Sequence, residues 1–203
     1  MQAFKILGGK KLKGEVKPQG AKNEALQIIC ATLLTSDEVV INNIPDIIDI
    51  NKLISLLKCL GVKVDKLGSN KYSFKADNID LDYLNSDQFK TDGKSLRGSI
   101  MIVGPLLARF GKAFIPRPGG DKIGRRRLDT HFENLIKLGG KFSYDKENKK
   151  YKIETKKLKG CKILLDQPSV TGTANIIMAS VLAEGETTIY NACLLYTSPS
   201  PRD

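Results

Sequence analysis

Residues 49–61 read DINKLISLLKCLG, a stretch whose leucines share one helical face and which closes on a glycine. This spacing predicts an amphipathic helix that Gly61 terminates. A second stretch, DTHFENLIKLG at residues 129–139, predicts a matching helix, and its Gly139 follows Gly61 by 78 positions. The chain therefore contains an internal repeat, and the repeat decides the fold.

Further elements recur around these two helices. The first copy predicts a strand at 38–43 before its helix and two strands after it, and the second copy repeats them. In the second copy the predicted strand before the helix is 113–116. The predicted strands after the helices are 62–66 and 71–75 in the first copy and 142–144 and 151–154 in the second. An order of strand-helix-strand-helix-strand-strand indicates an α/β fold in which helices pack on mixed sheets.

Each copy also has an earlier helix, and Lys22, Arg97 and Thr173 open these equivalent helices, 75 and 76 residues apart. We expect the first of these helices to continue through Leu34 and the second to run from about Ser95 through Leu107.

The third copy predicts a strand at 162–165, a helix to Ala183 and a strand at 187–192, and it then lacks the second helix and the closing strands. We place the units at about 20–76, 95–155 and 162–192. Residues 4–16 predict a short hairpin or two edge strands. Residues 193–203 have no periodicity, are rich in serine and proline, and are expected to form an unrelated, disordered tail on a truncated copy of a longer protein.

Composition indicates a soluble globular protein, with 203 residues, 41% apolar and 27% charged. Because no apolar run is long enough to span a membrane and the N-terminus has no apolar signal region, we expect a cytoplasmic protein with no membrane partner. Cys30, Cys59, Cys161 and Cys193 stand far apart and read as small buried hydrophobes. With a single histidine in the chain, no metal site is expected.

The formal net charge of +11 has three explanations: nucleic-acid binding, an anionic small substrate, or a lysine-rich proteome. Aromatic residues make up only 6% and do not interleave with the basic ones as a base-stacking platform requires. We therefore expect no nucleic-acid partner, although a basic nucleic-acid-binding module remains the alternative from another class.

A loop at residues 116–131, PRPGGDKIGRRRLDTH, joins two apolar segments and excludes regular structure by its prolines and glycines. Glycine lets backbone N–H groups approach an anion, and arginine adds a bidentate donor. The loop is either a grip for phosphate or carboxylate, or a solvated basic surface loop.

Several motifs resemble the enolpyruvyl transferase family, and the likeness runs in order from Met1 to Ala192. The motifs are Gly20-Ala21-Lys22-Asn23, Leu96-Arg97-Gly98-Ser99-Ile100, residues 104–111 (GPLLARFG), Pro118-Gly119-Gly120, Ile123-Gly124, Asp129 with His131, Pro168-Ser169-Val170 and residues 182–185 (LAEG). The resemblance implies an inside-out α/β barrel built from repeated units. It also implies that residues 1–19 belong with a second domain that this chain lacks.

The resemblance further implies a reaction: transfer of the enolpyruvyl group from phosphoenolpyruvate to the 3-hydroxyl of UDP-N-acetylglucosamine, the first committed step of peptidoglycan synthesis. No metal or organic cofactor takes part. The close alternative is the shikimate-pathway enolpyruvyl transferase, against which the long loop at 116–127 counts. A non-catalytic remnant is a third interpretation, and we expect the 203-residue chain alone to lack turnover.

By resemblance, Asp121 is the proton donor, at a position where cysteine is usual and aspartate is found in a minority of the family. An acid there needs a raised pKa, and a carboxyl group in place of a thiol implies fosfomycin resistance. The residues implied for phosphoenolpyruvate are Lys22, Asn23, Arg97 and Arg126. Those implied for UDP-N-acetylglucosamine are Asn23, Arg97, Arg126, Arg127, Leu128, Asp129, Thr130, Gln167, Pro168, Ser169 and Val170.

Two of these positions depart from the family pattern: Arg127 stands where proline is common, and Gln167 where a cation is frequent. Structural interpretations stand beside the functional ones. Lys22 fits a surface position at a helix start, Asp129 fits an N-terminal cap, and His131 fits either packing or a substrate contact.

Overall fold

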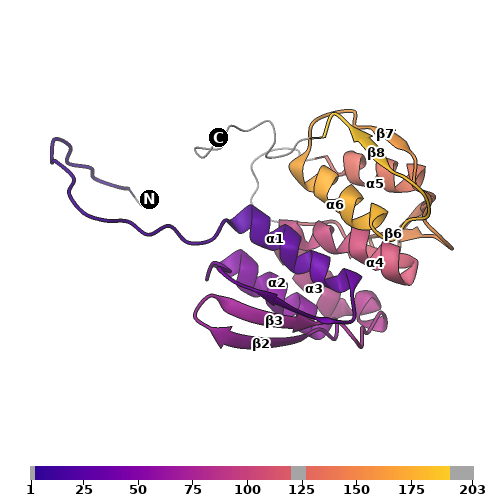
Figure 1. Ribbon diagram of the computed structural model, residues 1–203, viewed down its shortest axis with the longest axis horizontal. Coiled ribbons are helices and arrows are strands. Elements are labelled where there is room, and N and C mark those ends of the chain that lie inside the picture. The colour runs from indigo at the N-terminus through magenta and orange to yellow at the C-terminus, as the bar shows by residue number, and fades with distance from the viewer. Residues whose placement is uncertain (1–2, 120–126, 193–203) are drawn as a thin grey trace.

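The computed structural model describes residues 3–119 and 127–192 of the chain (Figure 1). The predicted α/β fold is confirmed, and most predicted elements are present. The first copy contains α1 (Lys22–Ala31), η1 (Thr32–Leu34), β1 (Glu38–Ile41), α2 (Ile48–Cys59), β2 (Lys63–Gly68) and β3 (Lys71–Lys75). The second contains η3 (Arg97–Ile102), α4 (Val103–Phe110), β4 (Lys112–Pro116), α5 (Asp129–Lys137), β5 (Lys141–Asp145) and β6 (Lys150–Glu154). The third contains β7 (Lys162–Leu164), α6 (Val170–Ser180) and β8 (Thr188–Tyr190).

The two glycines of the repeat end their helices in the same way. Gly61 and Gly139 have φ values of +100° and +104°, which a side chain disfavours. After α2 the N–H of Val62 donates to the carbonyl of Leu57 at 3.0 Å, and after α5 the N–H of Gly140 donates to that of Leu135 at 2.9 Å. This pattern is the Schellman motif, so the repeat seen in sequence is a repeat of backbone geometry.

The first two sheets share one topology. Their strand orders are β1-β3-β2 and β4-β6-β5, with every neighbouring pair antiparallel. Phe74 in the centre of the first sheet pairs with both flanking strands, as Ile153 does in the second. In the third copy β7 and β8 are parallel neighbours. Each sheet is therefore of one kind, and the expectation of mixed sheets is wrong for the described residues.

The helices lie inside and the sheets outside. Figure 1 shows α1, α4 and α6 packed side by side between the sheet of β2 and β3 and the pair β7 and β8, and α4 and α6 contact each other extensively. Residues in the middle of these helices, such as Ile29, Leu106 and Ile176, are fully buried. The expected inside-out arrangement is thus present, as separate sheets around central helices without a closed barrel among the described residues.

The tightest helix contact is between α4 and α6. Gly104 in α4 faces Asn175 in α6, and the Gly104 N–H donates to the Asn175 side-chain oxygen at 2.7 Å. A Cβ at position 104 would overlap both the backbone and the side-chain oxygen of Asn175. Only glycine permits this approach, and it brings the first turn of α4 against the middle of α6.

Arg109, at the other end of α4, holds the first copy against the second. Its guanidinium donates to the carbonyls of Leu33, Thr35 and Ala76 at 3.1, 2.9 and 2.7 Å. These acceptors lie at the end of η1 and after β3, where backbone carbonyls would otherwise lack partners. The planar donor set of one arginine satisfies all three.

Several sequence predictions differ from the structure. Residues 4–16 form neither a hairpin nor edge strands: the segment has no regular secondary structure, no strand of the described chain pairs with it, and its Phe4 and Leu12 are almost fully exposed. No strand opens the first two copies within the described residues. The helix expected from Ser95 begins as the 3-10 helix η3, and α6 begins at Val170, so that Thr173 lies within its first turns.

Two further differences concern the polar segment between the first two copies and the burial of the cysteines. The segment η2 (Asp82–Asn85) and α3 (Asp87–Ser95), which links the first two copies, was not predicted. Cys30 is buried, and burial raises the pKa of its thiol, but Cys59 is exposed and Cys161 partly exposed, so reading all the cysteines as buried is wrong. The predicted tail at 193–203 lies outside the described residues. Within the described residues, no helix has the length and apolar character needed to cross a membrane.

Replacement of Gly104 by alanine tests the α4–α6 contact. We expect Gly104→Ala to lower the free energy of unfolding by about 1–3 kcal/mol, because its methyl group must displace Asn175. Urea denaturation measures the change. Gly68→Ala is the matched control, since its nearest neighbour would be a side-chain carbon at 3.7 Å, and it should alter stability by less than about 0.5 kcal/mol. Equal stabilities of the two variants would contradict the contact.

Candidate functional site

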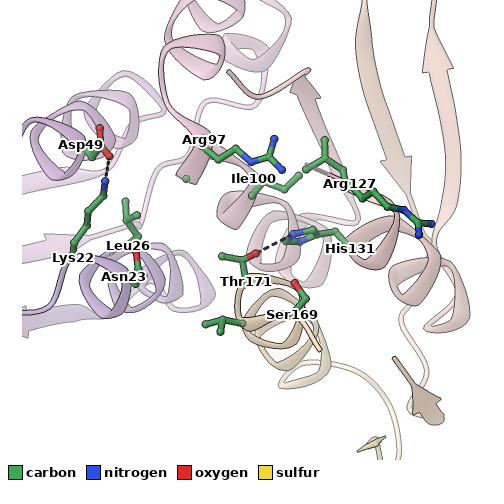
Figure 2. Close-up of a pocket in the computed structure, with 13 residues that line it drawn as sticks. Lys22, Asn23, Leu26, Asp49, Arg97, Ile100, Arg127, His131, Ser169 and Thr171 are labelled. Carbon is green, nitrogen blue, oxygen red and sulfur yellow. Dashed lines mark hydrogen bonds and ion pairs between the residues drawn. The ribbon is translucent and has the colours of Figure 1, made fainter. Parts of the chain in front are cut away.

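A cavity of about 330 Å³ opens where the beginnings of several helices meet. Figure 2 shows residues of this cavity, with Lys22 and Asn23 from α1 on one side and His131 and Thr171 on the other. Its walls come from the starts of α1, α2, η3, α5 and α6. The lining residues are Lys22, Asn23, Leu26, Asp49, Arg97, Gly98, Ile100, Arg127, Leu128, His131, Ser169, Val170 and Thr171.

The helix starts give the cavity donors and a positive field. The first N–H groups of a helix have no partner within it, and the helix dipole places partial positive charge there. Among the described residues no side chain caps α1, α2 or α5, whereas Ser169 caps α6 by accepting from the Gly172 N–H at 3.1 Å. Converging helix starts of this kind favour an anionic ligand.

Charged side chains strengthen this preference. Lys22, Arg97 and Arg127 line the cavity together with one carboxylate, that of Asp49. Lys22 forms an ion pair with Asp49, as Figure 2 shows. The positive excess that remains suits a ligand with more than one anionic group, such as a phosphate with a carboxylate or a diphosphate.

Arg127 is held by acids behind the cavity. Its Nε donates to the carboxylate of Asp129 at 2.7 Å, and Asp166 lies 4.0 Å from its guanidinium. This pairing raises the pKa of Arg127 further above its ordinary value, mainly through the hydrogen bond that Arg127 donates to Asp129. Figure 2 shows its guanidinium directed away from His131.

His131, the chain's only histidine, forms a buried part of the cavity wall. It is 3% exposed, and its ring nitrogens contact the Asn175 side-chain nitrogen at 3.1 Å and the Thr171 hydroxyl at 3.3 Å. Burial, and secondly the positive charge of Arg97, lower the pKa of His131 to about 4. The ring is therefore neutral at pH 7 and serves as a hydrogen-bonding group.

The structure brings together many residues that the motifs suggested separately. Those on the cavity wall are Lys22, Asn23, Arg97, Arg127, Leu128, Ser169 and Val170. Asp129, Thr130, Gln167 and Pro168 are not on the wall: Thr130 is buried and donates to Asp166 at 3.0 Å, and Gln167 contacts the Thr130 hydroxyl at 3.4 Å. Asp121 and Arg126 lie outside the described residues.

Some residues that line the cavity were not among the site residues that the motifs suggested. Leu26, Asp49, Gly98, Ile100 and Thr171 line the cavity without having been predicted there. The repeat contained a signal for one of them, because Asp49 precedes Gly61 by the same interval as Arg127 precedes Gly139. Equivalent positions at the starts of α2 and α5 therefore both reach the cavity. Thr171 had no comparable signal.

The chain thus combines repeated α/β units around central helices with a cationic cavity at the helix starts. Comparison with known proteins identifies the family. Residues 6–200 match the family described as EPSP synthase (3-phosphoshikimate 1-carboxyvinyltransferase). The chain belongs to this family of transferases.

Curated relatives agree with the family assignment, and a solved structure shares the fold. UDP-N-acetylglucosamine 1-carboxyvinyltransferase of Bacteroides fragilis is 62% identical over 192 residues, and the protein of that name from Porphyromonas gingivalis is 56% identical. Each match covers 95% of this chain and 44% of the relative. The crystal structure of the enolpyruvyl transferase NikO from Streptomyces tendae shares the fold with a TM-score of 0.68 at 18% identity, covering 90% of this chain and 42% of that one.

The buried histidine predicts a pH-dependent stability. Because the pKa of His131 is about 4 in the folded protein against an ordinary 6.5, unfolding takes up a proton between these values. Stability is then lost as pH falls below 6.5, by about 2 kcal/mol at about pH 5. Urea denaturation between about pH 5 and 7.5 measures this slope.

The histidine variant isolates that contribution. His131→Gln carries no titrating ring, so its stability should change much less over the same range. Asp77 and Glu184 also have lowered pKa values, due first to hydrogen bonds from Lys63 and Lys157. These carboxylates change the stability only as pH falls below their ordinary pKa values of 3.8 and 4.5, which lie below the tested range. A slope shared by the wild type and His131→Gln would contradict the neutral buried ring.

Proposed function

We propose that this cavity binds phosphoenolpyruvate and UDP-N-acetylglucosamine, and that the protein takes part in transferring the enolpyruvyl group to the 3-hydroxyl of the sugar. The observation that carries the proposal is that Lys22, Arg97 and Ser169, from three separate motifs, line one cavity. The names of relatives that are 56–62% identical supply the substrates. The chain spans about 44% of the length of these relatives, so the activity is proposed for the whole protein.

The chemistry needs fixed positive charge. The sugar 3-hydroxyl gives up its proton to a base and adds to C2 of phosphoenolpyruvate while C3 takes up a proton. The tetrahedral intermediate then loses phosphate from C2 and a proton from C3, and the double bond re-forms. Lys22 and Arg97 would bind the phosphate and carboxylate oxygens, and Arg126 would add a further cation from the loop. Asn23 would orient the hydroxyl that attacks. Preorganised cations and helix starts stabilise charge that develops in the transition state.

Proton delivery to C3 requires a general acid. We assign this role to Asp121 from its place in the loop sequence after Gly119-Gly120. A carboxyl group donates a proton near neutral pH only when its pKa is raised, which burial or a neighbouring anion achieves. The nucleotide-sugar contacts would come from Arg127, Leu128, Ser169 and Val170, with Asp129 holding Arg127 in place.

The shikimate-pathway alternative has less support. The relatives at 40–62% identity carry the name of the UDP-N-acetylglucosamine enzyme, whereas the EPSP synthase structure from Acinetobacter baumannii is 18% identical. The proposed reaction takes place in the cytoplasm. It serves peptidoglycan synthesis, and through it cell-wall biogenesis, cell shape and cell division.

Titration of the chain with each substrate tests the proposal. Lys22→Gln should lower the affinity for UDP-N-acetylglucosamine or phosphoenolpyruvate by about tenfold or more, because a charge-assisted hydrogen bond is lost. Calorimetry measures the affinities. Lys58→Gln, an exposed lysine of α2 away from the cavity, is the control with the same charge change. Equal affinities for the two variants, or no binding by the wild type, would reject the cavity as the substrate site.

The aspartate at position 121 leads to a prediction about fosfomycin, an epoxide that alkylates the usual loop cysteine of this family. A carboxyl group is a far weaker nucleophile toward an epoxide than a thiolate. The protein should therefore resist modification, and Asp121→Cys should gain a covalent adduct at that residue in the presence of UDP-N-acetylglucosamine. Mass spectrometry locates the adduct.

The exposed Cys59 provides an internal control for this experiment. It lies outside the cavity and should stay unmodified in both proteins. An adduct at Asp121 in the wild type, or none at position 121 in the cysteine variant, would show that residue 121 does not occupy the reactive position of the loop.

A further inference from the structure

The wall of the cavity contains a chain of polar groups that the proposed reaction does not use. It starts at the backbone of α4, passes through Asn175 of α6 and His131 of α5, and ends at Thr171 in the first turn of α6. Asn175 is fully buried and His131 nearly so, while Thr171 is exposed to the cavity. Each group fixes the hydrogen-bonding direction of the next.

The amide of Asn175 has one allowed orientation. Its oxygen accepts from the Gly104 N–H at 2.7 Å, and its nitrogen donates to the carbonyl of Ile100 at 3.0 Å. Rotating the amide by half a turn would place its NH₂ group against the Gly104 N–H, two donors facing each other. It would also place its oxygen against the Ile100 carbonyl, two acceptors facing each other. Backbone groups therefore set which end of the amide faces His131.

That orientation fixes the tautomer of His131. The second N–H of the Asn175 amide points at Nδ1 of the ring at 3.1 Å, so Nδ1 must accept. The ring proton is then on Nε2, which donates to the Thr171 hydroxyl oxygen at 3.3 Å. A protonated ring, or a proton on Nδ1, would oppose the amide hydrogen.

The charges around the ring agree with this state. Arg97 of η3 and burial hold the pKa of His131 low, as described above. On other elements, Lys22 of α1 is paired with Asp49 of α2, and Arg127 is paired with Asp129 of α5 and lies near Asp166. No described carboxylate hydrogen-bonds to the ring nitrogens, which leaves the neutral form favoured.

The hydroxyl of Thr171 has one proton, and Nε2–H already occupies an acceptor position on its oxygen. In the described residues this hydroxyl has no other hydrogen bond. We propose that Asn175 and His131 are positioning residues that fix Thr171 as a dedicated hydrogen-bond donor to an anionic oxygen of the ligand in the cavity. This inference rests on the proposed function, since it needs a ligand with phosphate or carboxylate oxygens there.

Nuclear magnetic resonance of the single histidine tests whether Asn175 fixes the tautomer of His131. In the full 203-residue chain labelled with ¹⁵N-histidine, one ring gives the whole signal. We expect the proton on Nε2 at pH 7 in the wild type. Asn175→Asp, which replaces the amide donor with an acceptor, should move the proton to Nδ1 or add a second one and raise the pKa. A wild-type ring protonated on Nδ1 would overturn the proposal without any variant.

Ligand titration tests whether the Thr171 hydroxyl donates to the ligand. The ligands are UDP, UDP-N-acetylglucosamine and phosphoenolpyruvate, each titrated separately. Thr171→Val removes the hydroxyl at nearly constant shape and should weaken binding about tenfold for the ligand whose oxygen it contacts. A loss with both uridine ligands assigns the contact to the diphosphate; a loss with phosphoenolpyruvate alone assigns it to that substrate. Thr171→Ser should restore the affinity.

The outcomes separate this inference from the proposed function. If Thr171→Val binds every ligand as tightly as the wild type while Lys22→Gln binds weakly, the substrate site stands and the role of Thr171 is overturned. If the wild type binds none of the ligands, the proposed function fails and this inference fails with it. If the valine variant loses affinity and serine does not restore it, the effect comes from shape and the donor role is overturned.

Discussion

The close approach of α4 and α6 at Gly104 and Asn175 is the contact on which the rest of the site depends. It replaces side-chain packing with a backbone-to-amide hydrogen bond of 2.7 Å in a fully buried place. A buried amide must satisfy all its donors and acceptors, and here it does so with the backbone of two elements and the ring of His131. The same contact that packs the helices therefore also orients the wall of the cavity.

The repeat explains why a cavity forms at this end of the molecule. Each copy has a helix that starts at the cavity, namely α1, η3 or α6, and the second helices of the first two copies contribute Asp49 and Arg127 at equivalent positions. Helix starts from different copies thus converge, and their dipoles add to the charge of Lys22 and Arg97. This architecture favours an anionic ligand before any particular substrate is considered.

The sequence predicted the helices and most strands because the spacing of leucines and the terminal glycines is a local signal. It could not predict α3, whose polar sequence buries little beyond Phe89 and depends on Ser86 as its N-terminal cap. It suggested one site for Lys22, Asn23 and Arg97, since resemblance carries whole motifs, and these residues line one cavity, while their roles as ligands stay predictions. That Thr130 lies off this wall, and that Asn175, His131 and Thr171 contact one another, could not be predicted, because packing between distant segments decides which face of a helix reaches a cavity.

A crystal structure of the chain with UDP-N-acetylglucosamine bound tests the central claim most directly. We expect electron density for the ligand between Lys22, Arg97 and Thr171, with the Lys22 ammonium moved from Asp49 to an oxygen of the ligand. Density at another surface, with the Lys22–Asp49 pair intact and the cavity unchanged, would contradict it.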